Sequence, residues 1–201
     1  MALPSPNQSG RYDVIYADPP WTFNTYSFKG KGRGAEAHYD CLSIEQIKGM
    51  PVSDWAKKNS VLYLWTTVPH LPQALQVIDA WGFKYKSSFV WVKDKIGTGY
   101  WARNRHELLL ISSRGSNVCP RYRGIPAVDS VISGQQRAHS QKPDQAREII
   151  DRYHPDAVKL EIFAREKVAG WDAWGLEVNT GVGKRRWKSN DAPKQREISV
   201  N

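Results

Sequence analysis

The chain has 201 residues, of which 40% are hydrophobic, and this length and composition indicate one globular domain with a sizeable core and exclude a disordered chain. No apolar run reaches the roughly 18 residues of a membrane span, and residues 1–10 lack the pattern of a signal peptide, so we expect a cytoplasmic protein that does not cross a membrane. The formal charge of +9 favours a polyanionic partner, because Lys and Arg bind phosphates with release of counterions.

Strand-like and helix-like patterns alternate along the chain. This alternation predicts an α/β fold with a mostly parallel sheet flanked by helices. The predicted strands are short apolar runs over Tyr12–Ala17, Ser60–Trp65, Ser88–Val92, Glu107–Ser112, Ala127–Ile132 and Val158–Phe163.

Two helices are predicted in the first half of the chain. The first is short, because Ser43 and Gln46 have the spacing of a capping box and Gly49 follows soon after. The second has apolar residues at the 3.6-residue period over Leu71–Ile78, and Gly82 is its stop signal.

A third helix and a change in composition define the second half. The helix begins near Pro143 and has an apolar face that reaches Tyr153, with Arg152 near its carboxyl end. From about Asn179 the chain is polar and basic with little periodicity. We therefore expect a single domain over residues 1–178 and a basic, flexible tail over residues 179–201.

The sequence Asp18-Pro19-Pro20-Trp21 directly follows the first predicted strand, where ligands collect in open α/β sheets. An exocyclic amine on a purine is a poor nucleophile, because its lone pair is delocalised into the ring. The Asp18 carboxylate and the Pro19 carbonyl could accept hydrogen bonds from such an amine and free its lone pair. Pro19 and Pro20 stiffen the turn, and Trp21 could stack on the base. The alternative is that the motif is only a turn.

Basic residues gather at three places that also contain glycines or aromatic rings. These groups are Lys29, Lys31 and Arg33 in a glycine-rich stretch, Arg103 and Arg105 beside Trp101, and Lys184, Arg185, Arg186 and Lys188 around Trp187. Each group either binds nucleic acid or is an ordinary solvated surface. The stretch Lys29–Ala37 could also close over a bound nucleotide as a lid, or be a plain surface loop.

Metal and disulfide chemistry are not supported by the cysteines. Cys41 and Cys119 lie far apart, and neither belongs to a Cys-x-x-Cys or Cys/His cluster. We therefore expect no metal site and no disulfide framework.

The chain resembles the MT-A-seventy family of N6-adenine methyltransferases, which includes the catalytic subunit of the eukaryotic messenger-RNA adenosine methyltransferase and many phage and bacterial DNA enzymes. The resemblance runs from about Tyr12 to Glu177. It is carried in order by Asp18-Pro19-Pro20-Trp21, Tyr39, Leu62-Tyr63-Leu64-Trp65, Trp81-Gly82-Phe83, Trp91-Val92-Lys93, Arg103-Asn104-Arg105-His106-Glu107, His139-Ser140-Gln141-Lys142-Pro143 and Leu160-Glu161-Ile162-Phe163-Ala164-Arg165.

The resemblance implies S-adenosylmethionine as methyl donor and a Rossmann-like methyltransferase fold. Lys142 and the helix that follows it would attract the donor carboxylate, unless Lys142 is simply solvated. Arg165 would reach the ribose or carboxylate of the donor, or else form a surface ion pair with Glu166 or Glu161. By resemblance, Glu177 would accept from the ribose hydroxyls, and Asp18 would also touch the donor's amino group.

On the acceptor side, Tyr39 matches a family tyrosine that lies against the target adenine, although a tyrosine there could belong to the core. Arg103, Asn104 and Arg105 match a loop that contacts nucleic acid, with ordinary surface charge as the alternative. Three tryptophans within or at the ends of regular elements are expected in the core instead: Trp65, Trp81 and Trp91.

The chain departs from the family at two positions. Leu176 stands where an asparagine is common, so a ribose hydrogen bond is lost, and Ala164 stands where glycine is frequent. The resemblance implies methylation of adenine N6 in nucleic acid, with DNA favoured over RNA by analogy with compact relatives. The same chemistry on RNA and a catalytically silent nucleic-acid-binding partner are the alternatives. A homodimer is compatible with the sequence, but no apolar stripe demands one.

Overall fold

The structure is a computed structural model that describes residues 10–22, 42–97, 99, 101–116, 118–133 and 141–175. Its centre is a seven-stranded sheet in the order β5-β3-β4-β2-β1-β6-β7. The strands are β1 (Tyr12–Ala17), β2 (Ala56–Thr67), β3 (Lys84–Val92), β4 (His106–Arg114), β5 (Val131–Ser133), β6 (Lys159–Ile162) and β7 (Asp172–Trp174).

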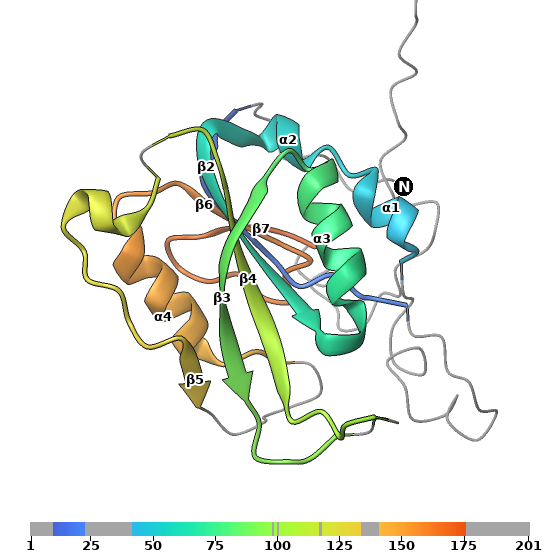
Figure 1. Ribbon diagram of the computed structural model, residues 1–201. Coiled ribbons are helices and arrows are strands. Elements are labelled where there is room, and N and C mark those ends of the chain that lie inside the picture. Colours follow the sequence, from blue (N-terminus) through green and yellow to red (C-terminus); the bar gives the residue numbers. More distant parts are fainter. Residues whose placement is uncertain are drawn as a thin grey trace, which may run out of the picture.

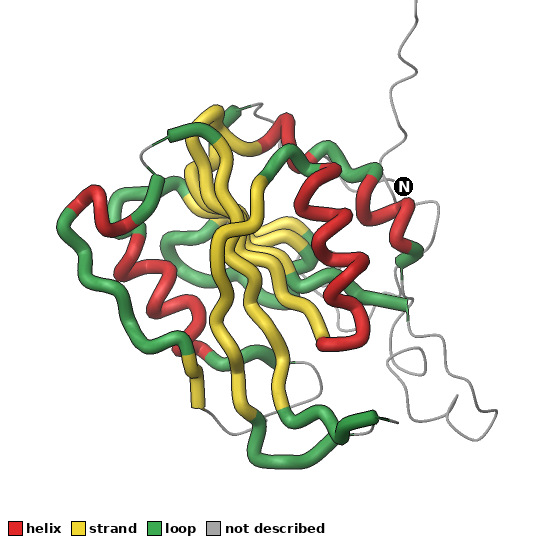
Figure 2. The backbone as a smooth tube through the Cα atoms, in the orientation of Figure 1, coloured by secondary structure: helices red, strands yellow, loops and turns green. Residues whose placement is uncertain are grey.

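Helices cover both faces of this sheet (Figures 1 and 2). The helices are α1 (Ile44–Lys48), α2 (Val52–Trp55), α3 (Leu71–Ala80) and α4 (Asp144–Tyr153), with 3-10 turns η3 (Val68–His70) and η4 (Pro120–Arg123). In Figure 1, α1 and α3 lie on one side of the strands and α4 on the other. The fold is therefore the three-layered α/β architecture that the alternating sequence pattern predicts.

Most strand pairs are parallel, as predicted. Strand β1 is parallel to both β2 and β6, while β6 is parallel to β7 and β3 to β5. Strand β4 is the exception, because it runs antiparallel to both β2 and β3. The carboxyl ends of the six parallel strands and the amino end of β4 consequently share one edge of the sheet, which we call the carboxyl edge.

The core has one part on each face of the sheet, as the two-residue period of strand side chains requires. Ile15 of β1 and Leu62 of β2 pack with the buried face of α3. Tyr16 and Tyr63, one residue further along each strand, pack with the buried face of α4. Burying a large apolar side chain stabilises the fold by roughly 1.5–3 kcal/mol, so the two faces hold the sheet rigid beneath its edge.

The structure confirms most of the elements that were predicted from local sequence patterns. Strand β1 has the predicted bounds, and the predicted runs in β2, β3 and β4 lie inside the observed strands. The capping box of α1 is confirmed, because the Gln46 backbone N–H donates to Ser43 Oγ and the Ser43 N–H donates to Gln46 Oε1. The three tryptophans expected in the core, Trp65, Trp81 and Trp91, are buried there.

The prediction for Ala127–Ile132 was mostly wrong, since the strand in this region is only Val131–Ser133. The Val128 N–H donates instead to the Tyr153 hydroxyl at 2.9 Å, so this segment is tied to α4 rather than paired in the sheet. Asp129 then accepts from the Val131 N–H at 2.9 Å, which forms a turn just before the short strand. The short elements α2 and β7 were not predicted.

Some predictions fall outside the described residues. These are the lid over Lys29–Ala37, the domain limit at residue 178 and the tail over residues 179–201. Within the part of the chain that the structure describes, no helix is long and apolar enough to cross a membrane.

Candidate active site

Asp18 lies at the carboxyl edge, immediately after β1 and between the ends of β2 and β6. Its carboxylate Oδ2 is 2.7 Å from the ammonium of Lys142, which precedes α4. The Asp18 side chain is 25% exposed to solvent, and the Lys142 side chain is 13% exposed. The sequence predicted a role for each residue separately, and the structure brings the two into direct contact.

Two further charges extend this pair. Glu107, near the start of β4, has Oε2 at 3.5 Å from Lys142 Nζ, and its Oε1 accepts a short hydrogen bond from Lys93. The result is a row of alternating charges, Lys93, Glu107, Lys142 and Asp18, which we call the charge row. Sequence reasoning assigned no role to Lys93 or Glu107, although both lie in segments that resemble the family.

Aromatic rings lie directly against the charge row. The Lys142 ammonium lies 5.6 Å from the ring centre of Trp65, and that of Lys93 lies 5.1 Å from the ring centre of Trp91. The two rings meet edge to face at 6.1 Å. Cations over aromatic faces are attracted by the ring quadrupole, so the two core tryptophans support the site from within.

Burial and the attraction between opposite charges act against each other at Lys142, Glu107 and Asp18. Burial favours the neutral form of Lys142, but the carboxylates of Asp18 and Glu107 outweigh it and raise the Lys142 pKa. Burial also opposes the charge of Glu107, yet Lys142 and Lys93 hold its pKa below the usual range. Burial raises the pKa of the Asp18 carboxyl, against the attraction of the Lys142 ammonium.

The turn Asp18-Pro19-Pro20-Trp21 is tightly closed by its own backbone. The Trp21 N–H donates to the Pro19 carbonyl at 2.9 Å, and the Leu42 N–H donates to the Pro20 carbonyl at 3.0 Å. Pro19 was predicted to offer its carbonyl to a substrate amine. Because a carbonyl oxygen has two lone pairs, Pro19 can accept a second hydrogen bond beside this internal one.

Trp21 differs from its prediction as an open stacking surface. Its ring is only 6% exposed and belongs to the core on the α3 face. The indole N–H donates to the Trp65 carbonyl at 3.1 Å, and His70 stacks against the ring. The structure therefore gives Trp21 a packing role that anchors the turn, and a base could stack on it only after the ring left this packing.

Arg165 reaches the same edge through a special backbone conformation. Phe163, directly after β6, has a left-handed φ of +64°, which is rare for a bulky residue and typical of functional turns. The Ala164 N–H donates to the Trp174 carbonyl at 3.1 Å, and this bond joins the ends of β6 and β7. The charge of Arg165 is close enough to act on both Asp18 and Lys142.

Gly175 is required where these two ends meet. A Cβ atom at this position would lie 2.2 Å from the Ala164 carbonyl oxygen, a distance that no side chain tolerates. Glu161 was named with Glu166 as an alternative ion-pair partner of Arg165, and its carboxylate is bound by another arginine. Arg147 of α4 holds the Glu161 carboxylate through two contacts of 3.0 Å.

The predicted nucleic-acid loop connects β3 to β4 at the carboxyl edge (Figure 1). Arg103 and Arg105 are exposed, and each donates from Nε to a carbonyl of the same loop, Gly97 and Lys93 respectively. The Asn104 carbonyl accepts from the Gly97 N–H at 2.8 Å. Nearby, Trp101 is fully exposed. The loop thus presents two guanidinium groups and an indole on the side of the sheet where Asp18 lies.

The remaining predicted site residues lie outside the described part of the chain: Tyr39, Lys29, Lys31, Arg33 and Glu177. Their roles stay predictions.

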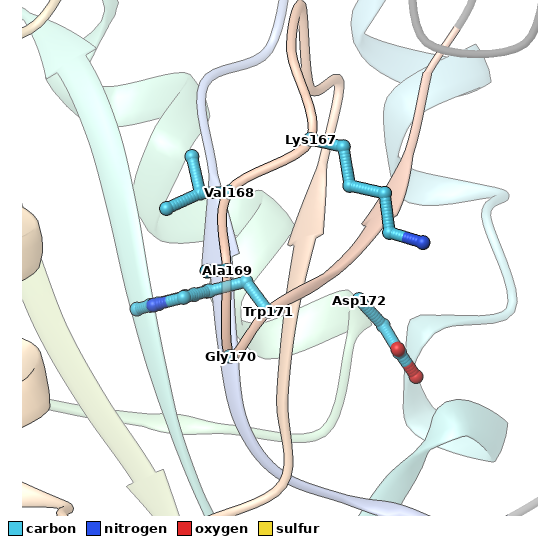
Figure 3. Close-up of a pocket in the computed structure, with 6 residues that line it drawn as sticks. All are labelled: Lys167, Val168, Ala169, Gly170, Trp171 and Asp172. Atoms are coloured by element: carbon cyan, nitrogen blue, oxygen red, sulfur yellow. The ribbon is translucent and has the colours of Figure 1, made fainter.

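A surface pocket lies away from this site. It is lined by residues 167–172, and Figure 3 shows Lys167 and Asp172 on one side of this segment and Val168 and Trp171 on the other. Asp172 accepts from the Tyr12 hydroxyl at the start of β1, so the pocket is at the opposite edge of the sheet from Asp18. The chemistry of the carboxyl edge therefore does not extend to it.

Comparison with known proteins agrees with the geometry. The family model MT-A70 matches residues 12–177. The chain is 30% identical over 184 residues to the type II methyltransferase M.MunI of Mycoplasma sp, with 84% of this chain and 78% of that protein covered.

Eukaryotic relatives are longer. The chain is 27% identical over 181 residues to the probable N(6)-adenosine-methyltransferase MT-A70-like of Oryza sativa subsp. japonica, with 85% of this chain and 23% of that protein covered. It is 26% identical over 164 residues to the N(6)-adenosine-methyltransferase catalytic subunit METTL3 of Homo sapiens, with 78% of this chain and 26% of that protein covered. The chain thus spans about a quarter of these two relatives. From its matched residues and the arrangement of its carboxyl edge, the chain belongs to the MT-A70 family.

Proposed function

We propose that the protein transfers a methyl group from S-adenosylmethionine to the N6 amine of adenine in nucleic acid, with DNA favoured over RNA. The observation that carries the proposal is the Asp18 carboxylate, held at the carboxyl edge of the sheet by a 2.7 Å contact with Lys142. Ligands of open α/β sheets bind at this edge. Membership of the MT-A70 family supplies the reaction class.

Asp18 acts as a hydrogen-bond acceptor in this proposal. Its carboxylate and the remaining acceptor position of Pro19 take hydrogen bonds from the adenine amine and direct the nitrogen lone pair outward. S-adenosylmethionine supplies an electrophilic methyl group on a positively charged sulfur. The alkylated amine is strongly acidic, so a water molecule can take the proton that it loses.

The residues at this edge fit a donor that has a carboxylate, an amino group and ribose hydroxyls. Lys142 and Arg165 provide cations for the carboxylate, and Asp18 accepts from the amino group. Glu177 is proposed to accept from the ribose hydroxyls. Because Lys142 is already shared between Asp18 and Glu107, we propose that it orients the Asp18 carboxylate as well as binding the donor.

The acceptor nucleic acid is proposed to lie across the β3–β4 loop. Arg103, Asn104 and Arg105 contact its backbone, and the exposed ring of Trp101 is a further contact surface. Lys29, Lys31 and Arg33 are proposed to contribute phosphate contacts, and Tyr39 to lie against the target adenine. We favour DNA because the chain covers 78% of a type II methyltransferase and about a quarter of the two N(6)-adenosine-methyltransferases.

The test is methyl transfer from tritiated donor to matched DNA and RNA oligonucleotides, single-stranded and double-stranded. We expect label in N6-methyladenine, with more on DNA than on RNA. The variant Asp18→Asn keeps the shape of the side chain but loses its charge, so it should lose transfer while keeping part of its donor binding in calorimetry. Donor binding without transfer by the parent protein would identify the catalytically silent alternative, and equal transfer by Asp18→Asn would refute the role of Asp18.

Cytoplasmic residence and a homodimer are further parts of this proposal. Light scattering at several protein concentrations tests the second.

A further inference from the structure

His70 contacts the Asp18–Trp21 turn from the neighbouring strand end. It is the last residue of η3, which follows β2 at the carboxyl edge, and it is only 8% exposed. Its ring stacks on the Trp21 ring with centres 5.7 Å apart and planes inclined by 17°. Its Nε2 lies 3.0 Å from the backbone carbonyl of Thr22. One side chain therefore holds both residues at the end of the turn.

The hydrogen bonds define the state of the ring. A backbone carbonyl can only accept, so Nε2 must carry a proton and donate to Thr22. Nδ1 lies 2.8 Å from the Thr67 hydroxyl, which donates to it when the ring is neutral. Burial lowers the pKa of His70 and the Thr22 carbonyl partly opposes this effect, so the net shift favours the neutral ring.

The turn is held at both ends by different means. At its start, Ala17 is paired with β2 on one side and β6 on the other. At its end, Trp21 donates to the Trp65 carbonyl and stacks on His70. The Thr22 hydroxyl also donates to the Leu42 carbonyl at 2.8 Å. Asp18 lies between these two fixed points, so a movement of the far end can be transmitted to it through Pro19 and Pro20.

We infer that His70 is a positioning residue, and that its neutral ring clamps Trp21 and Thr22 so that the Asp18 carboxylate is presented to the acceptor amine. The inference rests on the proposed function and adds a residue that touches neither substrate nor donor. Reacting groups must be held within a fraction of an ångström, and a displacement of about 1 Å can lower a rate by about 100-fold. His70 thus acts through the turn rather than through chemistry of its own.

Two substitutions separate the contacts of His70. His70→Phe keeps a ring against Trp21 and removes both hydrogen bonds, while His70→Gln keeps a donor for the Thr22 carbonyl. Thr67→Val removes only the hydroxyl that fixes the ring, with almost no change of shape. The control is His154→Gln, because His154 is also buried but lies at the end of α4, at the opposite edge of the sheet.

We expect His70→Phe to lower kcat by about 10-fold to 100-fold, with KM for the donor changed less than about threefold. His70→Gln should recover most of that loss, and Thr67→Val should lower kcat by about threefold. All rates are compared at a temperature where each variant remains folded. A His70→Phe kcat within twofold of the parent, or a loss no larger than that of His154→Gln, would overturn the inference.

A second measurement does not depend on activity. Nitrogen-15 NMR of the imidazole rings distinguishes the two neutral forms and the charged form, and the His70→Phe spectrum assigns the signal among the five histidines. We expect the form with the proton on Nε2 at pH 7. A neutral ring with its proton on Nδ1 would refute the clamp, because Nε2 could then not donate to the Thr22 carbonyl. If the parent protein transfers no methyl group, the proposed function fails and this spectrum alone decides the clamp.

Discussion

Replacing Lys142 by methionine tests the charge row most directly. The change keeps much of the aliphatic side chain and removes the ammonium that lies 2.7 Å from Asp18 and 3.5 Å from Glu107. Glu107 retains Lys93 as its partner. Asp18 loses its closest opposite charge, so most of the cost should come from this one carboxylate.

The size of the effect follows from burial. Breaking a fully buried ion pair by removing one partner costs about 3–5 kcal/mol, because an uncompensated charge is left behind. The Asp18 side chain keeps 25% of its exposure, and water reduces the penalty accordingly. We therefore expect Lys142→Met to lower the free energy of unfolding by about 3 kcal/mol, near the lower limit of that range. In the Asp18→Asn background, the same change should cost about 1 kcal/mol, because no carboxylate is stranded.

Urea unfolding at pH 7 of the parent, both single variants and the double variant gives the coupling free energy between the two side chains. Lys142→Arg is the matched control, since it keeps the charge and should stay close to the parent. A coupling free energy below about 0.5 kcal/mol would refute the account, because non-interacting positions are additive within that limit.

The same substitution should change the pH dependence of the reaction. Removing the ammonium removes the attraction that opposes burial, so the pKa of Asp18 rises further. A protonated carboxyl group is a weaker acceptor for the amine, so activity falls as the pH falls through that pKa. The acid limb of kcat/KM should therefore move clearly to higher pH in the residual activity of Lys142→Met, and only slightly in Lys142→Arg. An unchanged limb in both variants would contradict the role of Lys142.

Three more predictions test other parts of the structure. Burial lowers the pKa of His154 to about 4, against an ordinary value of 6.5, so the unfolded state takes up its proton first and stability falls as the pH drops from 6.5 to 4. The loss should be about 3 kcal/mol, and the pH dependence of urea midpoints should be smaller in His154→Gln. Gly175→Ala would place its Cβ 2.2 Å from the Ala164 carbonyl oxygen. We therefore expect the free energy of unfolding in urea to fall by about 1–3 kcal/mol and donor binding in calorimetry to weaken. Unchanged values would mean that the β6 and β7 ends can separate freely. Replacing Arg103 and Arg105 by glutamine should weaken nucleic-acid binding. The slope of log affinity against log salt concentration should fall by about 1 for each phosphate that the variant no longer binds. An unchanged slope in a fluorescence titration would show that the loop lies outside the interface.

Features with local causes could be predicted from the sequence. Strand β1 is a short run rich in Tyr, Val and Ile that ends one residue before a double proline, so both its bounds were correct. The capping box of α1 needs only Ser43 and Gln46 at the right spacing. The position of Asp18 at the carboxyl edge followed from its place after a strand, because this rule depends on chain direction and not on sheet order.

Features that depend on contacts between residues far apart in the sequence could not be predicted. The contact between Glu107 and Lys142 exists because β4 begins at the edge where the parallel strands end, and this antiparallel insertion leaves no mark in the sequence pattern. The burial of Trp21 depends in the same way on the β2 end, which supplies His70 and the Trp65 carbonyl. A tryptophan after two prolines has the same sequence signal whether its ring is exposed or packed, so only the tertiary structure distinguishes the two.

The charged residues of the structure fall into two groups, which the net charge of +9 alone does not distinguish. In the charge row, two ammonium groups and two carboxylates balance one another, and each member is held by the next. A balanced row can fix the Asp18 carboxylate, because each of its cations already contacts a carboxylate of the row. The excess positive charge must then act elsewhere, and the exposed guanidinium groups of Arg103 and Arg105 lie beside the site rather than within it. In the proposed function, attraction of the polyanion and orientation of the amine belong to different residues. The first should therefore depend strongly on salt, while the second should depend on it less because its charges are partly buried.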